Sequence, residues 1–157
     1  KPVDFNATVD ESMLLLASSA SEGTRLLVDL CAEDVLVRGD ATQLSQVIYN
    51  LVLNAIQAVD KRGRIHVTTT RVPAESGTPG EVVLEIADDG QGLPEAVMLK
   101  LFQPFVTTKR SGVGLGLSIV KRIVETHNGR LEVESPRKSL GHGALFRVML
   151  PDAASGQ

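Results

Sequence analysis

The run Asp88-Asp89-Gly90-Gln91-Gly92 directly follows residues 81–87, a segment with the apolar, β-branched character of a strand. A second run, Gly112-Val113-Gly114-Leu115-Gly116-Leu117, leads straight into residues whose apolar side chains have helical spacing. The first run therefore ends a predicted strand with glycines, and the second begins a predicted helix with them. Glycine allows backbone conformations and close approaches that other residues resist, so both junctions are candidates for a ligand site.

The surrounding residues predict a mixed α/β domain. Asp40 is placed to cap a helix whose apolar residues recur at spacings of three and four, and Lys61-Arg62-Gly63 ends it. Residues 64–71 and 81–87 predict two strands, and the polar loop between them predicts a hairpin. The other expected elements are strands at 25–30, 35–37, 131–134 and 144–150, helices at 94–101 and from Leu115, and a first helix that Thr8 caps together with Glu11. Strands and helices are intermixed, which favours a two-layer α/β sandwich with a mixed sheet and helices on one face.

Composition sets the broad class of protein. The 157 residues suffice for one domain with a real core, which we place at 1–151, with a disordered tail at 152–157. The net charge of -3 argues against a non-specific nucleic-acid binder. No apolar run approaches the roughly 20 residues of a membrane span, and the single Cys31 excludes an internal disulfide. We expect a cytoplasmic monomer without nucleic-acid or direct membrane contact. It would be a piece of a longer protein, anchored or soluble, because the chain lacks an initial Met.

Asp88 has the chemistry of an adenine-reading acid. An ionised carboxylate accepts hydrogen bonds and cannot donate them. Adenine offers an exocyclic amine at the position where guanine offers a carbonyl, so a buried acid would select adenine. Gly90 and Gly92 would let the backbone approach a flat ring. The alternative is an ordinary turn, because Asp-Gly pairs are common in turns.

Asn50 and Asn54 share one face of the predicted helix, because they are four residues apart. An amide oxygen is a hard ligand that suits a magnesium ion already neutralised by phosphates. The alternative is a pair of asparagines that bond to neighbouring backbone groups.

The run from Gly112 to Leu117 predicts an anion site, because backbone N–H groups and the positive end of the dipole meet at a helix start. No Lys-Ser or Lys-Thr pair follows the glycines, so the run is not a P-loop. Leu117 stands where a dinucleotide fingerprint has its third glycine, so that motif is excluded as well.

Residues 102–112 have no periodicity and are expected to form a mobile loop. Thr107, Thr108, Lys109 and Arg110 would let this loop close over a triphosphate with hydroxyls and cations. The alternative is a solvated surface loop. The three histidines lack metal-ligand spacing and are assigned no chemistry: His66, His127 and His142.

Four segments resemble, in order, the N, G1, F and G2 boxes of sensor histidine kinases: Q-V-I-Y-N-L-V-L-N-A-I-Q-A, D-D-G-Q-G-L, L-F-Q-P-F-V-T-T-K and G-V-G-L-G-L-S-I-V. The resemblance covers residues 40–151 and implies the catalytic and ATP-binding domain of these kinases. It implies the Bergerat fold that gyrase-like ATPases and heat-shock chaperones share, a mixed sheet of about five strands under about three helices. The Thr-Thr-Lys run looks most like the nitrogen-regulation and oxygen-sensing branch.

The resemblance also implies roles for individual residues. Asn54 is similar to the family's magnesium ligand, and Asn50 to its neighbour near the phosphates. Asp88 resembles the adenine-binding acid, and residues 102–112 resemble the ATP lid. The other residues implied to contact the nucleotide are Gln57, Gly90, Gly92, Leu93, Thr107, Thr108, Lys109, Gly112, Val113, Gly114, Leu115, Gly116 and Leu117.

Three departures from the family pattern stand out. Many members carry Lys where Gln57 stands, and here Lys109, Lys61 or Arg62 are the alternative phosphate contacts. Many carry Thr where Ala144 stands, so adenine would lose a secondary contact. The chain has no His-Glu phosphoacceptor box.

The resemblance implies a protein histidine kinase domain that binds ATP and Mg²⁺. It would transfer the γ-phosphoryl group to a histidine on a dimerisation domain absent from this chain, and so serve a response regulator indirectly. No catalytic residue is assigned within the chain, because the general base and the acceptor are expected outside it. The alternatives are an ATPase or anti-sigma-type serine kinase of the same superfamily, or a non-catalytic nucleotide-binding module.

Overall fold

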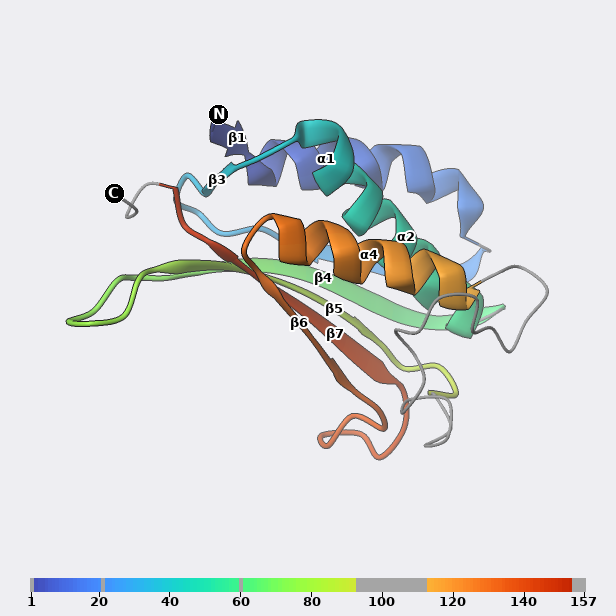
Figure 1. The fold of residues 1–157 in the computed structure, drawn as a ribbon. Helices are drawn as coiled ribbons and strands as arrows, with labels where there is room; N and C mark the ends of the chain where they lie inside the picture. Colours follow the sequence, from blue (N-terminus) through green and yellow to red (C-terminus); the bar gives the residue numbers. More distant parts are fainter. Residues whose placement is uncertain (1, 21, 60, 93–112, 154–157) are drawn as a thin grey trace.

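Three α-helices cover one face of a five-stranded sheet in the computed structural model, which describes residues 2–20, 22–59, 61–92 and 113–153 (Figure 1). The helices are α1 (Phe5–Leu16), α2 (Ala41–Val59) and α4 (Val113–Thr126), and a 3-10 turn, η1 (Ala17–Ser19), extends α1. The strands of the large sheet are β2 (Gly23–Asp29), β4 (Arg62–Val72), β5 (Glu81–Asp88), β6 (Arg130–Glu134) and β7 (Ala144–Pro151). Two short strands, β1 (Pro2–Asp4) and β3 (Leu36–Arg38), pair separately. The predicted two-layer sandwich is confirmed.

The large sheet is mixed and has the strand order β2-β4-β5-β7-β6. β2 runs parallel to β4, and the other neighbouring pairs are antiparallel. The predicted hairpin is the β4–β5 pair, in which Asp88 lies opposite Ile65. On its other side Asp88 lies opposite Ala144, the first residue of β7. The pairing therefore places Asp88 at one end of two central strands.

The core between helices and sheet is largely aliphatic and determines which way Asp88 faces. Val82, Leu84 and Ile86 are fully buried and belong to the core cluster. Side chains of a strand alternate between the two faces, so Asp88 continues this inner series and faces the helices. It is 1% exposed.

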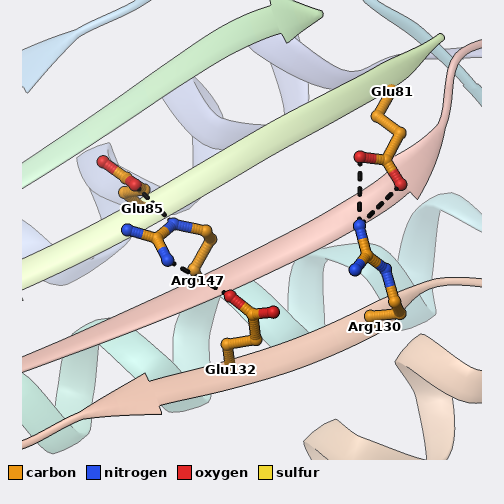
Figure 2. A network of polar contacts seen from close by, with 5 residues as sticks. All are labelled: Glu81, Glu85, Arg130, Glu132 and Arg147. Carbon is orange, nitrogen blue, oxygen red and sulfur yellow. Dashed lines mark hydrogen bonds and ion pairs between the residues drawn. The ribbon is translucent and has the colours of Figure 1, made fainter.

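The opposite face of the sheet carries cross-strand ion pairs (Figure 2). Arg147 bonds Glu85 at 2.6 Å and Glu132 at 3.2 Å, and Arg130 bonds Glu81 at 3.0 Å. Partly exposed pairs of this kind each contribute little to stability. The ion pairs therefore lie on the outer face, and the apolar inner face holds the two layers together.

The helix that carries Asn50 and Asn54 begins as predicted. The Asp40 carboxylate accepts the Gln43 N–H at 3.0 Å, and the Asp40 carbonyl accepts the Leu44 N–H at 2.9 Å. The predicted end of this helix, at Lys61-Arg62-Gly63, lies a few residues too late. α2 ends at Val59, and β4 already begins at Arg62, where it pairs with β2.

The predicted cap of the first helix is wrong. Asp4 caps α1, because its carboxylate accepts the Ala7 N–H at 3.1 Å. Thr8 lies inside the helix, is buried, and donates its hydroxyl to the Asp4 carbonyl at 3.1 Å. The helix begins earlier because Phe5 is 1% exposed and anchors its first turn in the core.

The predicted disorder is wrong for the first two residues of the tail. Asp152 is buried and its carboxylate bonds Arg71 Nε at 2.6 Å, while the Ala153 N–H donates to the Leu36 carbonyl at 2.8 Å. Residues 154–157 lie outside the described residues, as do the predicted helix at 94–101 and the predicted loop at 102–112. In the described part of the chain, no helix combines the length and apolar character needed to cross a membrane.

Candidate nucleotide site

Asp88 is a buried carboxylate that accepts two hydrogen bonds from described backbone groups. Its Oδ1 accepts the Gly90 N–H at 2.9 Å, and the Ala144 N–H also bonds the carboxylate. Burial raises the pKa of Asp88, while these two backbone bonds and the charge of Arg137 oppose the rise and Asp89 adds to it. An ionised carboxylate has about four acceptor positions, and donors from the described residues fill two of them, which leaves two for a donor from a ligand.

The glycines after Asp88 are required by their protein surroundings. A Cβ on Gly90 would lie 2.5 Å from the Ala58 carbonyl oxygen, near the end of α2. Gly92 has φ +77°, and a Cβ there would lie 2.9 Å from Ser135 Oγ. The Asp88–Gly92 segment is therefore packed between α2 and the loop that follows β6. This packing explains both glycines without a ligand, a reason that sequence reasoning did not supply.

The end of α2 meets the Asp88–Gly92 segment. Asn50, Asn54 and Gln57 are half-buried, at the margin of the stripe that includes the fully buried Leu51. Because Ala58 touches Gly90 and follows Asn54 by one helical turn, the predicted metal ligand lies near the predicted base-binding segment. The structure thus brings these two motifs together.

The glycine-rich run opens α4, as predicted from its sequence. α4 begins at Val113 and packs against α2, with Leu117 buried at 1% exposure. A Cβ on Gly116 would have no heavy atom within 4 Å among the described residues. Glycine in a helix costs about 1 kcal/mol relative to alanine. The described fold gives no steric reason for glycine at this position.

The remaining predicted contacts are only partly described. Gly114 and Leu115 lie in the first turn of α4. The predicted lid residues and their neighbours lie outside the described residues: Leu93, Thr107, Thr108, Lys109 and Gly112.

Sequence reasoning missed the β6–β7 loop, residues 135–143. Arg137 Nη1 donates to the Asp88 carbonyl oxygen at 3.2 Å, and His142 Nδ1 lies 3.4 Å from the Gly90 carbonyl oxygen. Gly143 has φ +85°, and a Cβ on it would overlap the Asp88 carbonyl oxygen. The Gly-His-Gly run at 141–143 could have signalled a tight turn, but nothing local pointed to Arg137.

A second histidine links the two helices of the site. His127 Nε2 accepts the Asp40 N–H at 3.2 Å, and its Nδ1 lies 2.8 Å from the Ile123 carbonyl oxygen. The imidazole therefore ties the C-terminal end of α4 to the start of α2. Within the described residues, no group of three or more His, Cys, Asp or Glu side chains could hold a metal ion.

Residues 39–154 match the family model described as histidine kinase-, DNA gyrase B- and HSP90-like ATPase. The chain belongs to this family. It is 36% identical over 154 residues to the sensor histidine kinase TmoS of Ectopseudomonas mendocina, covering 96% of this chain and 15% of TmoS. It is 36% identical over 151 residues to the sensor histidine kinase ZraS of Escherichia coli K12, covering 95% of this chain and 30% of ZraS. The chain thus spans less than a third of either kinase.

Solved structures agree with this assignment. The nucleotide-free catalytic domain of the histidine kinase ThkA superposes with a TM-score of 0.81 and 30% identity, covering 97% of this chain and 95% of that domain. Full-length ShkA in complex with AMPPNP superposes with a TM-score of 0.78 and 29% identity, covering 98% of this chain and 31% of ShkA. The chain is the ATP-binding catalytic domain of the sensor histidine kinase type, and the predicted family and fold are confirmed.

Proposed function

We propose that this domain binds Mg-ATP with the adenine against Asp88 and the phosphates at the start of α4, between α2 and the loop that follows β5. The parent kinase would then transfer the γ-phosphoryl group to a histidine on its own dimerisation segment. The buried Asp88 carboxylate carries the proposal. It is the one carboxylate of β5 that faces the helix layer, and backbone donors of the described residues leave two of its acceptor positions unused.

The other described residues fit the same ligand. Gly116 lies in the first turns of α4, where a Cβ would meet no heavy atom of the described residues within 4 Å, at the helix end that attracts anions. Asn54 is a half-buried amide one turn before the Ala58–Gly90 contact. Mg²⁺ prefers phosphate and water oxygens with one or two protein ligands, so the single amide of Asn54 would suffice. The metal would neutralise charge on the phosphates.

The transfer step requires a group from outside this chain. The bond between the γ-phosphorus and the bridging oxygen of ADP breaks, a bond from that phosphorus to an imidazole nitrogen forms, and ADP leaves. The imidazole proton passes to a base on the acceptor segment. None of His66, His127 and His142 is followed by the Glu of a phosphoacceptor box. Thr107, Thr108 and Lys109 remain predicted lid contacts to the phosphates.

The proposed partners follow from this division of labour. The acceptor segment would supply the dimer contacts, so this domain by itself would be monomeric. Its location in the parent kinase would be cytoplasmic. A ThkA structure contains the response regulator TrrA, which supports a response regulator as the final acceptor for the parent of this chain. A superfamily ATPase or serine kinase is the competing proposal, and ATP hydrolysis by the domain alone would favour it.

Calorimetric titration of the domain with Mg-ATP tests the base site. Replacing Asp88 with Asn turns one acceptor oxygen into a donor, which should weaken ATP binding by about 1–3 kcal/mol. Asp89→Asn is the matched control, because Asp89 Oδ1 is already bonded to the Arg64 N–H at 2.8 Å and an amide oxygen can replace it. ATP affinity of Asp88→Asn equal to that of the unmodified domain would remove Asp88 from the base site.

Labelled ATP tests the transfer. The domain alone should acquire no acid-labile phosphate, and adding the separately produced dimerisation segment of the parent should give phosphohistidine on that segment. Label on the domain itself would contradict the proposed division.

A further inference from the structure

Several residues of the β6–β7 loop contact the segment that carries Asp88. Arg137 donates to the Asp88 carbonyl oxygen, His142 lies beside the Gly90 carbonyl oxygen, and Ser135 Oγ faces Gly92. The loop connects β6 and β7 at the end of the sheet where β5 also ends (Figure 1). It therefore borders each of the residues proposed to line the base.

The conformation of this loop is fixed by its own hydrogen bonds. The Arg137 carbonyl accepts the Leu140 N–H at 3.1 Å and the Gly141 N–H at 2.7 Å, and the Arg137 N–H donates to the His142 carbonyl at 3.3 Å. Ser135 Oγ closes the loop by donating to the Gly143 carbonyl at 3.0 Å. Arg137 thus begins a tight turn, and both its backbone N–H and its carbonyl are held by hydrogen bonds within the loop.

The guanidinium of Arg137 acts on Asp88 in two ways. Its Nη1 bonds the Asp88 main chain at 3.2 Å, which fixes the end of β5. Its charge lowers the pKa of the Asp88 carboxyl and so opposes the larger effect of burial. Among the described residues, the other titratable groups that face this segment are Asp89, which raises the pKa of Asp88, and His142, beside the Gly90 carbonyl oxygen. Arg137 is a cation of the described part of the chain whose charge favours the ionised carboxylate.

We propose that Arg137 is a positioning residue for the nucleotide base: its hydrogen bond to the Asp88 carbonyl oxygen fixes the end of β5, and with it the place where the Asp88 carboxylate accepts a hydrogen bond from the base. This inference rests on the proposed adenine site and assigns it a residue on a loop outside the four sequence motifs. Protonation would turn one of the Asp88 oxygens into a hydroxyl donor and leave fewer acceptor positions for the adenine amine, which is itself a donor.

The test compares ATP affinity in Arg137→Met, Arg137→Lys and the unmodified domain over about pH 5 to about pH 8 by calorimetry. Arg130→Met is the matched control, because it removes the same charge from an ion pair on the opposite face of the sheet (Figure 2). Thermal unfolding of each variant verifies that it is folded.

Arg137→Met should bind ATP roughly tenfold more weakly near neutral pH, the effect of one charge-assisted hydrogen bond. Its affinity should also begin to fall at a higher pH than in the unmodified domain. Arg137→Lys should restore the pH profile, and Arg130→Met should match the unmodified domain.

Two results would overturn the inference and leave the proposed function intact: unchanged affinity and pH profile in Arg137→Met, or an equal loss at every pH that lysine does not rescue. The second result would assign Arg137 a structural role only. If the unmodified domain binds no ATP, the proposed function fails first, and the role of Arg137 fails with it.

Discussion

Replacing Gly143 with alanine probes how closely the β6–β7 loop packs on Asp88. Gly143 has φ +85°, and an added Cβ would overlap the Asp88 carbonyl oxygen and lie 3.1 Å from the Asp89 Cα. The left-handed conformation alone costs alanine about 1–2 kcal/mol. The loop would also have to move away from β5, which breaks the Arg137–Asp88 hydrogen bond and costs about 0.5–1.5 kcal/mol more. With the overlap itself, we expect a loss of about 2–5 kcal/mol in the free energy of unfolding.

Gly141→Ala is the matched control within the same turn. Gly141 has φ +80°, but an added Cβ would have no heavy atom within 4 Å among the described residues. This variant should lose only the conformational cost, about 1–2 kcal/mol. Urea unfolding of both variants, with and without Mg-ATP, measures the difference. Equal losses of stability in the two variants would refute the close packing of the loop on Asp88, and with it the steric basis of its role in the site.

Three further predictions concern charge, capping and the core. Because the folded-state pKa of Asp88 is raised, its contribution to folding stability is present below its unfolded pKa and is lost as pH rises through the folded pKa. ATP affinity should show the opposite trend and fall as the pH is lowered through the folded pKa of Asp88. Urea unfolding would measure the stability trend and calorimetry the affinity trend over the same pH series. Asp40→Ala should destabilise the domain by about 0.5–2 kcal/mol while Asp40→Asn retains most of the stability, since both side chains can cap α2; equal losses in urea unfolding would contradict the cap. Leu51→Ala should cost about 2–5 kcal/mol, because Leu51 is 0% exposed, whereas Leu14→Ala at 79% exposure should change the free energy by less than about 0.5 kcal/mol.

The sequence predicts those parts of the fold that depend on local patterns. α2 is identified by its apolar spacing and by Asp40, because a helix cap and a hydrophobic stripe are set within a few residues. The β4–β5 hairpin is predicted for the same reason, since its two strands are close in sequence. The family assignment depends on the order of four short motifs. Each motif alone also fits an ordinary structural role, such as a turn or a solvated surface loop.

Features decided by distant residues are not predictable in this way. The parallel pairing of β2 with β4 joins segments on either side of α2. Asp152 is buried because Arg71, on β4, reaches it, and its local sequence is typical of a solvated tail. Thr8 has a plausible capping pattern, but the burial of Phe5 starts α1 earlier. In each case a tertiary contact overrides a local preference.

Asp88 is where the local pattern and the fold conflict most directly, and the conflict itself is informative. Its position in β5 is an inner-face position, and the inner-face residues before it, Val82, Leu84 and Ile86, are all apolar. An apolar residue there would avoid the cost of burying a carboxylate, which the raised pKa of Asp88 reflects. Two backbone N–H groups bond the Asp88 carboxylate, and Arg137, on a tightly turned loop, bonds the Asp88 main chain. Stability alone does not account for that arrangement, which supports the proposal that a ligand donates a hydrogen bond to Asp88 at this point.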